Sequence, residues 1–175
     1  MLKKGSVHLY YGDGKGKTSA ALGIALRAIG HGMKVLVIQL MKGREWVGEF
    51  KAQEKIKGLK VEQYGTPSFI NLYAPDSKDK ERAMQGLIRA KQAMRNHEAD
   101  VIIIDESLYA VEFGLIPLSA LIELIKEKPS DIELVLTGGR DPPIELIDLA
   151  DYVSHIVMEK HPYMEGINAR QGIDY

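Results

Sequence analysis

The chain has 175 residues, a net charge of −1 and no cysteine, with 45% hydrophobic and 27% charged residues. At this length residues 1–175 can bury one core without disulfides or a structural metal, so we expect a single domain. The balanced charge and the absence of cysteine, of a signal-peptide core and of any membrane-length apolar run predict a cytoplasmic protein without nucleic-acid or membrane partners, and exclude thiol chemistry.

A phosphate-binding loop is the first feature along the chain. A predicted strand over Ser6–Tyr11 leads into a glycine-rich turn, and a helix opens at Lys17-Thr18. This order matches the pattern G-x-x-x-x-G-K-[ST], except that Tyr11 stands in place of the first glycine. Glycines let the backbone turn its amides inward to form an anion site with the helix N-terminus, a lysine adds a point charge, and a threonine hydroxyl suits Mg²⁺. The predicted phosphate-binding residues are Gly12, Asp13, Gly14, Lys15, Gly16, Lys17, Thr18 and Ser19.

The next segments predict a βαβ unit and a polar loop. Thr18–Ile29 reads as a buried, alanine-rich helix, and the apolar run Lys34–Leu40 suits a parallel strand covered on both faces. Met41–Glu49 follows at the carboxyl end of that strand, where ligands of open α/β sheets bind. Its polar and aromatic residues either contact substrate or form a solvated loop with one anchoring tryptophan. These residues are Lys42, Arg44 and Trp46.

A short helix over Phe50–Lys57 and a strand over Leu59–Tyr64 precede a long irregular loop, Gly65–Asp79. A loop of this length in a compact domain is more often functional or mobile than idle. Its apolar residues either meet a flat apolar ligand or pack on the core, and they are Phe69, Leu72 and Tyr73. A long helix over Lys80–His97 follows. Its candidate caps are Ser77 and Asp79.

The apolar run Val101–Ile104 followed by Asp105-Glu106 is the second strong signal. Its branched residues predict a buried strand, and two carboxylates at the carboxyl end of such a strand stand where phosphate-loop enzymes hold Mg²⁺. The alternative is a strand end with helix-capping acids. The predicted metal-binding residues are Thr18, Asp105 and Glu106.

The remaining segments continue the alternation of strands and helices. Arg140 lies in the turn Thr137–Pro143, after a predicted strand, where it either contacts an anionic group or belongs to a surface turn. The alternation predicts an α/β three-layer sandwich with a mostly parallel sheet and right-handed crossovers. The other predicted elements are helices over Ser107–Phe113, Pro117–Glu127 and Glu145–Leu149 and strands over Ile132–Leu136 and Tyr152–Met158.

Over nearly its whole length the chain resembles the ATP:corrinoid adenosyltransferases. The resemblance rests on the loop Gly12–Thr18, the strand ending at Asp105-Glu106, the turn Thr137–Arg140, the run Asp148–Asp151 and the ending His161–Tyr175. It implies a P-loop NTPase fold of the RecA-like type, a homodimer, and MgATP as the adenosyl donor. The variant glycine loop is typical of that family.

The resemblance also implies a reaction and roles for residues. The 5′-deoxyadenosyl group of ATP would pass to the Co(I) of a corrinoid, with release of triphosphate, in coenzyme B12 synthesis or salvage. Lys17, Thr18 and Glu106 would serve catalysis, Arg140 the triphosphate, and Phe69, with Tyr73 or Trp46, the corrinoid face. A flavoprotein would supply the reductant. The chain departs from the family at Asn71, where a tryptophan is expected.

Two other readings stay open from the sequence. A kinase or ATPase acting on the γ-phosphate would use the same loop and the same pair of carboxylates. A non-catalytic nucleotide-binding or nucleic-acid-binding module is the other alternative, and the net charge argues against it. The products separate the enzymes: triphosphate with a cobalt–carbon bond, or ADP with phosphate.

Overall fold

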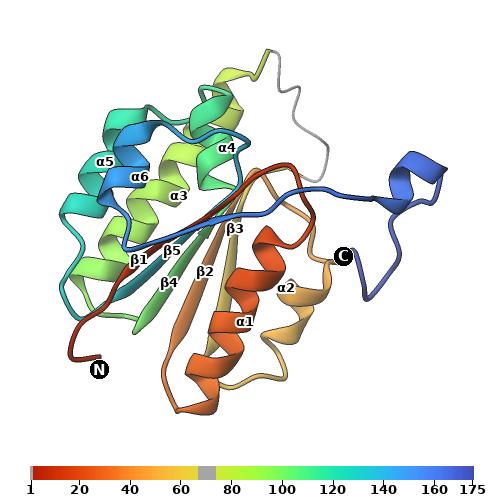
Figure 1. Cartoon of the computed structure of the whole chain (residues 1–175). Helices are drawn as coiled ribbons and strands as arrows, with labels where there is room; N and C mark the ends of the chain where they lie inside the picture. The colour runs from red at the N-terminus through yellow and green to blue at the C-terminus, as the bar shows by residue number, and fades with distance from the viewer. Residues whose placement is uncertain (1, 67–73) are drawn as a thin grey trace.

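The computed structural model describes residues 2–66 and 74–175, and their six strands form one sheet (Figure 1). The strand order is β3-β2-β4-β5-β1-β6, and every hydrogen-bonded pair is parallel. The strands are β1 (Val7–Tyr11), β2 (Val35–Leu40), β3 (Leu59–Tyr64), β4 (Val101–Asp105), β5 (Glu133–Thr137) and β6 (Tyr152–His155). The predicted α/β class with a mostly parallel sheet is therefore confirmed.

Helices cover both faces of the sheet and produce the three predicted layers (Figure 1). One face carries α1 (Lys17–Gly30) and α2 (Gly48–Ala52). The other face carries α3 (Ser77–Arg95), α4 (Ser107–Glu112), α5 (Leu118–Lys126) and α6 (Ile144–Leu149). A short 3₁₀ helix, η1 (Pro162–Glu165), lies in the C-terminal tail.

The central strands are buried on both sides because their apolar residues alternate between two cores. In β2, Leu36 and Ile38 pack in the core beneath α3 and α5, whereas Val35 and Val37 pack in the core beneath α1. Small residues on the inner face of α1 allow that helix to lie close to the sheet, and they are Ala21, Ala25 and Ala28.

The start of α3 differs from its prediction. The N-cap is Asp76, whose Oδ1 accepts a hydrogen bond from the backbone N–H of Asp79 at 2.8 Å. Ser77 is the first helical residue, so the prediction that Ser77 or Asp79 caps the helix is wrong. An aspartate one position earlier satisfies the same first-turn amide.

The end of β6 also differs from its prediction. The strand ends at His155 rather than Met158, because the chain then bends to follow the glycine loop after β1. The N–H of Gly14 donates to the carbonyl of Ile156 at 2.9 Å, and the N–H of Met158 donates to Oδ1 of Asp13 at 3.0 Å. The segment that follows the last strand therefore fixes the loop that follows the first.

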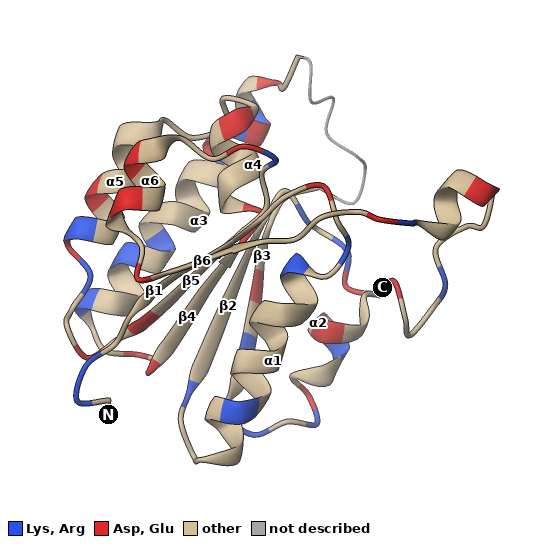
Figure 2. Cartoon of the chain, viewed as in Figure 1, with Lys and Arg blue, Asp and Glu red and all other residues tan. Residues whose placement is uncertain are grey.

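Parallel strands bring the segments after β1, β2, β4 and β5 to one edge of the sheet. These segments hold the predicted site residues: the glycine loop, Met41–Glu49, Asp105-Glu106 and Thr137–Pro143. Acidic and basic residues are interspersed along the chain (Figure 2). Among the described residues, no helix has the length and apolarity needed to span a membrane.

Candidate active site

The glycine loop between β1 and α1 is shaped by backbone torsions and by close packing. Gly12 and Gly16 have φ of 116° and 123°, which L side chains rarely adopt. Gly14 has no such torsion, but a Cβ there would lie 2.7 Å from the carbonyl carbon of Val157. Glycine is therefore needed at position 14 for space rather than for conformation.

Two of the loop amides do not face inward as the sequence predicted. The N–H of Gly12 donates to the carbonyl of Gly139 at 2.9 Å, and Gly14 is bonded to Ile156. Both amides fasten the loop to neighbouring segments. The amides that have no intrahelical acceptor are those of the first turn of α1, which holds Lys17, Thr18 and Ser19.

Lys17 lies across the loop. Its Nζ donates to the carbonyls of Gly12 at 2.7 Å and Gly14 at 2.8 Å, and it lies 5.8 Å from the centre of the Tyr109 ring. Burial lowers the pKa of Lys17, although the carboxylates around it, Glu106 first, act in the opposite direction. The ammonium group is thus held at the centre of the loop.

Asp105 lies at the end of β4, is fully buried and makes more side-chain hydrogen bonds than the other residues described at this site. Its Oδ1 accepts from the hydroxyls of Thr18 at 2.8 Å and Thr137 at 2.7 Å. Its Oδ2 accepts from Nζ of Lys42 at 2.6 Å and Nε2 of Gln39 at 3.2 Å. Burial alone would raise the pKa of Asp105, but the charge of Lys42 and these hydrogen bonds hold it below its usual range. Asp105 is therefore an ionised anchor that orients the Thr18 hydroxyl.

Glu106 has a different environment from its neighbour. Its φ is 65°, a left-handed conformation, and its N–H donates to Oγ1 of Thr137 at 3.0 Å. Its Oε2 is buried and has no hydrogen-bond partner among the described residues. A Cβ at Gly138 would lie 3.0 Å from that oxygen. Burial, followed by the negative charge of Asp105, raises the pKa of Glu106 to about 7.

The Met41–Glu49 loop forms a wall of the site. Lys42 donates a hydrogen bond to Asp105. Burial lowers the pKa of Lys42, but the carboxylates of Asp105 and Glu106 raise it by more, so the pKa of Lys42 is raised overall. The guanidinium of Arg44 lies 5.6 Å from the centre of the Trp46 ring. Lys42 and Arg44 line a cavity at this edge, and contact of the loop with substrate stays a prediction.

Two cavities adjoin at this edge. The first, of about 440 Å³, is lined by the residues 14–19 of the loop, by Lys42, Glu49 and Glu106, and by the segment 172–175. The second, of about 370 Å³, shares Lys42, Glu49 and Glu106 with the first and adds Tyr109, Phe113 and Arg140. A triphosphate and an attached organic group could therefore occupy neighbouring spaces.

Other predicted residues have partners that differ from those expected. Asp13 bonds the N–H of Met158, Lys15 forms an ion pair with Asp174, and Arg140 is exposed at the rim of the second cavity. Phe69 lies outside the described residues. Sequence reasoning gave Asp174 and Tyr175 no role, although both line the two cavities and belong to the ending that carried the family resemblance.

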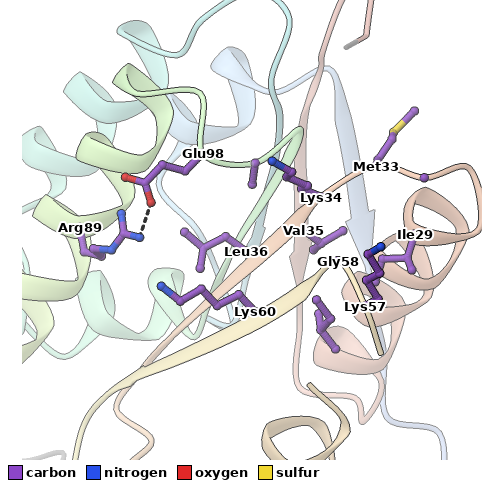
Figure 3. A pocket seen from close by; sticks show the side chains of 13 residues that line it. Ile29, Met33, Lys34, Val35, Leu36, Lys57, Gly58, Lys60, Arg89 and Glu98 are labelled. Carbon is purple, nitrogen blue, oxygen red and sulfur yellow. Dashed lines mark hydrogen bonds and ion pairs between the residues drawn. The ribbon is translucent and has the colours of Figure 1, made fainter. Parts of the chain in front are cut away.

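A further cavity, of about 650 Å³, lies at the opposite edge of the sheet (Figure 3). It opens beside the starts of β2 and β3, among Lys34, Lys57 and Lys60 and near the Arg89–Glu98 ion pair. The predicted site residues in the described part of the chain do not line it. Cavity size alone would have pointed away from the glycine loop.

A family model for ATP:corrinoid adenosyltransferase BtuR/CobO/CobP matches residues 3–175. The chain belongs to the ATP:corrinoid adenosyltransferase family. The predicted family and enzyme class are confirmed: the chain is a transferase of cobalamin synthesis and salvage that uses ATP and a corrinoid. The kinase and binding-module readings give way to this assignment.

Curated relatives carry the same description. The corrinoid adenosyltransferase of Escherichia coli (strain K12) is 32% identical over 173 residues, which cover 99% of this chain and 87% of the relative. Corrinoid adenosyltransferase CobA of Salmonella typhimurium has the same identity and coverage. A corrinoid adenosyltransferase of a Sinorhizobium species is 32% identical over 99% of this chain and 81% of its own length.

Solved structures support the fold. A KaiC-like protein, PH0186 from Pyrococcus horikoshii, matches with a TM-score of 0.58 and 18% identity, covering 91% of this chain and 76% of that one. The flagellar accessory protein FlaH of Methanocaldococcus jannaschii matches with a TM-score of 0.55 and 12% identity, covering 88% and 72%. At these identities the likeness concerns the fold alone, which is the predicted RecA-like P-loop fold.

Proposed function

We propose that this adenosyltransferase grips the triphosphate of ATP at the Gly12–Ser19 loop, with Lys17 as its central cation. The observation that carries the proposal is the position of the Lys17 ammonium, held by two loop carbonyls at the wall of the first cavity. On phosphate binding these carbonyl bonds exchange for bonds to phosphate oxygens, which as anions are the stronger acceptors.

In the reaction, the electron pair of Co(I) forms a bond to the 5′ carbon of ATP while the bond from that carbon to the phosphate oxygen breaks. The electron pair of that bond leaves with the triphosphate. Because the corrinoid supplies the nucleophile, the protein needs no nucleophilic side chain. Its tasks are to align the reactants and to stabilise the departing negative charge. Lys17 and the first-turn amides of α1 are suited to the second task, and Arg140 stands at the rim beside them.

The residues at the loop fit a divalent cation. The buried Oε2 of Glu106 lacks a partner, and the Thr18 hydroxyl is held by Asp105, so two oxygen donors flank the first cavity. No cluster of three or more acidic, histidine or cysteine residues occurs in the described ranges, so phosphate oxygens and water would complete the shell. We assign Thr18 and Glu106 to hold Mg²⁺, with Asp105 orienting Thr18. When bound, Mg²⁺ neutralises charge on the triphosphate.

The finer points of the assignment are also proposals. A homodimer is supported by the apolar side chains exposed on the edge strand β6. A cytoplasmic location is supported by the cysteine-free sequence. A single domain is supported by the one sheet that organises the described residues. A role for Phe69 against the corrinoid, and for a flavoprotein reductant, rests on the family resemblance.

The test is anaerobic incubation with MgATP and chemically reduced cobalamin, with the corrinoid spectrum followed for formation of a cobalt–carbon bond. Lys17→Ala should reduce the rate by about 10²-fold or more, because a preorganised charge at the leaving group is lost. Lys126→Ala, at the exposed end of α5, is the matched control and should react as wild type does. ADP as the only nucleotide product, or full activity of Lys17→Ala, would overturn the proposal.

A further inference from the structure

The segment 170–175 returns from the exposed tail and meets the glycine loop. Nζ of Lys15 donates to the carbonyl of Ile173 at 3.2 Å and forms an ion pair with Oδ1 of Asp174. Lys15 belongs to the loop that binds phosphate in the proposed function. The far end of the chain is thus tied to the loop by a residue of the loop itself.

Asp174 is braced from its own segment. Its Oδ2 accepts from the backbone N–H of Arg170 at 2.8 Å and from Nε of Arg170 at 3.1 Å. The hydrogen bond from Lys15, followed by those from Arg170, holds the pKa of Asp174 well below its usual range. Two cations therefore share one carboxylate, and the cluster keeps a net positive charge beside the phosphate cavity.

The last residue of the segment contacts the opposite wall. The ring of Tyr175 meets the ring of Trp46 edge to face, with centroids 4.7 Å apart and planes at 88°. A Cβ on Gly48, where α2 begins, would lie 3.8 Å from the carbonyl carbon of Tyr175, and Figure 1 shows the end of the chain beside α2. Tyr175 is half-buried, whereas residues 162–174 are exposed. The segment therefore crosses the mouth of the first cavity from the loop to the Met41–Glu49 wall.

We propose that the segment 170–175 is a wall of the triphosphate site and that Asp174 is a positioning residue that holds the Lys15 ammonium toward the phosphates. The inference rests on the proposed function and adds to it a residue distant in sequence. Without Asp174, Lys15 would keep the 3.2 Å hydrogen bond to the carbonyl of Ile173 but lose its ion pair, and its charge would be held less firmly.

The direction in which one substitution changes triphosphate binding separates a positioning role for Asp174 from the role of a nearby negative charge. If Asp174 were only a nearby negative charge, its removal would strengthen triphosphate binding, because one repulsive charge would be gone. If Asp174 positions Lys15, its removal weakens binding in spite of the more positive site. We expect Asp174→Asn to raise the Kd for MgATP and for inorganic tripolyphosphate about twofold to fivefold, the size of an exposed ion pair.

The experiment measures those Kd values by calorimetry for wild type, Asp174→Asn, Lys15→Ala, the double variant and Lys17→Ala. Asp174→Asn should add nothing to Lys15→Ala, because the carboxylate acts through that lysine. Glu165→Gln, which removes a tail carboxylate paired with Lys160, is the matched control and should bind as wild type does. Emission from Trp46, the single tryptophan, should respond to tripolyphosphate in wild type and less in Asp174→Asn.

Unchanged or tighter binding by Asp174→Asn would overturn the inference. It would also be overturned if Asp174→Asn weakened binding by the same factor in the Lys15→Ala background as in wild type, because that result indicates a purely structural effect. Circular dichroism of each variant shows whether the fold is kept. If Lys17→Ala binds tripolyphosphate as tightly as wild type, the proposed function fails and this inference fails with it. If Lys17→Ala behaves as expected and Asp174→Asn does not, the inference alone fails.

Discussion

Two adjacent carboxylates show how much the surroundings decide at the scale of single residues. Asp105 is fully buried, and its two oxygens accept four hydrogen bonds, so burial does not protonate it. Glu106 has one buried oxygen without a partner, in a chain that turns through a left-handed conformation. The sequence predicts two acids at a strand end, but it does not distinguish the acid with four hydrogen bonds from the acid whose buried oxygen has no partner among the described residues.

The raised pKa of Glu106 predicts a pH-dependent stability. In the unfolded chain Glu106 ionises near its ordinary pKa of 4.5, whereas in the folded protein it keeps its proton up to about pH 7. Its contribution to stability is therefore complete below pH 4.5 and is lost as the pH rises to about 7. Glu106→Gln removes this titration. We therefore expect the unfolding free energy of the variant, relative to that of wild type, to rise by about 1–3 kcal/mol as the pH is raised from 5 to 8.

Urea unfolding at both pH values, in EDTA and without nucleotide, measures this difference. Groups remote from Glu106 titrate equally in both proteins and cancel in the comparison, whereas Lys17 and Lys42, which feel its charge, add to the measured difference. A stability difference between variant and wild type that stays constant with pH would contradict the shifted pKa.

Some partners of the predicted site residues could not be found from the sequence around those residues. Asp13 bonds the backbone of Met158, 145 positions away, and Lys15 bonds Asp174, 159 positions away. The glycine-loop motif assigns both residues to phosphate, because a local motif contains no information about partners so distant in sequence. The same holds for Tyr175, whose contact with Trp46 joins two loops that no periodicity links.

At the scale of elements, the strands of the sheet and the longer helices were predictable, because each has either an apolar period or a continuous apolar run. The ends were less predictable, since they depend on single capping residues and on neighbours in space. Asp76 caps α3 instead of Ser77, and β6 ends early because the chain turns toward the glycine loop. A helix predicted over Phe50–Lys57 is the shorter α2, Gly48–Ala52.

Two glycines near the loop should respond in opposite ways to alanine. A methyl group at Gly14 would meet backbone atoms of Ile156 and Val157 at 2.8 and 2.7 Å, closer than real Cβ atoms approach. We expect Gly14→Ala to lose about 1–3 kcal/mol of unfolding free energy through overpacking. A methyl group at Gly23, within α1, has no atom within 4 Å, so Gly23→Ala should gain about 0.5–1 kcal/mol.

Urea unfolding of both variants checks these values, and calorimetry with MgATP should show weaker binding for Gly14→Ala only. Equal stability of the two variants would mean that the segment after β6 does not press on the loop. In that event the steric account of Gly14 would be wrong.

At the scale of the whole molecule, the alternation of strands and helices was enough to predict the layers and the parallel sheet. The strand order was not predictable, because β1 pairs with β5 and β6 and these pairings are remote in sequence. The order matters for function, since it sets β5 between the strand of the glycine loop and the strand of the acidic pair. Thr137, at the end of β5, then reaches both Asp105 and Glu106.

The exposed edge of the sheet predicts self-association. Tyr152 and Val153 of β6 and Val157 beyond it are 57%, 41% and 55% exposed, an apolar strip on an edge strand. We expect wild type to sediment as a dimer at micromolar concentration and Val153→Lys to weaken the dimer about tenfold or more, as a charge placed in an interface core does. Ile88→Lys, at an exposed position of α3, is the control. A wild type that stays monomeric at about 100 micromolar would contradict the dimer.

The pairing of β1 has a consequence for how the protein is made. Residues of this strand leave the ribosome before those of both neighbouring strands, because Val7 pairs with Leu134 and Tyr10 with Ser154. The carbonyls of Gly139 and Ile156, which hold the glycine loop, arrive later still than most of the core. Long-range pairing of this kind slows folding, because a large loop must close before the contacts are gained. The contacts that hold the glycine loop are therefore among the last in the described part of the molecule that can form during synthesis.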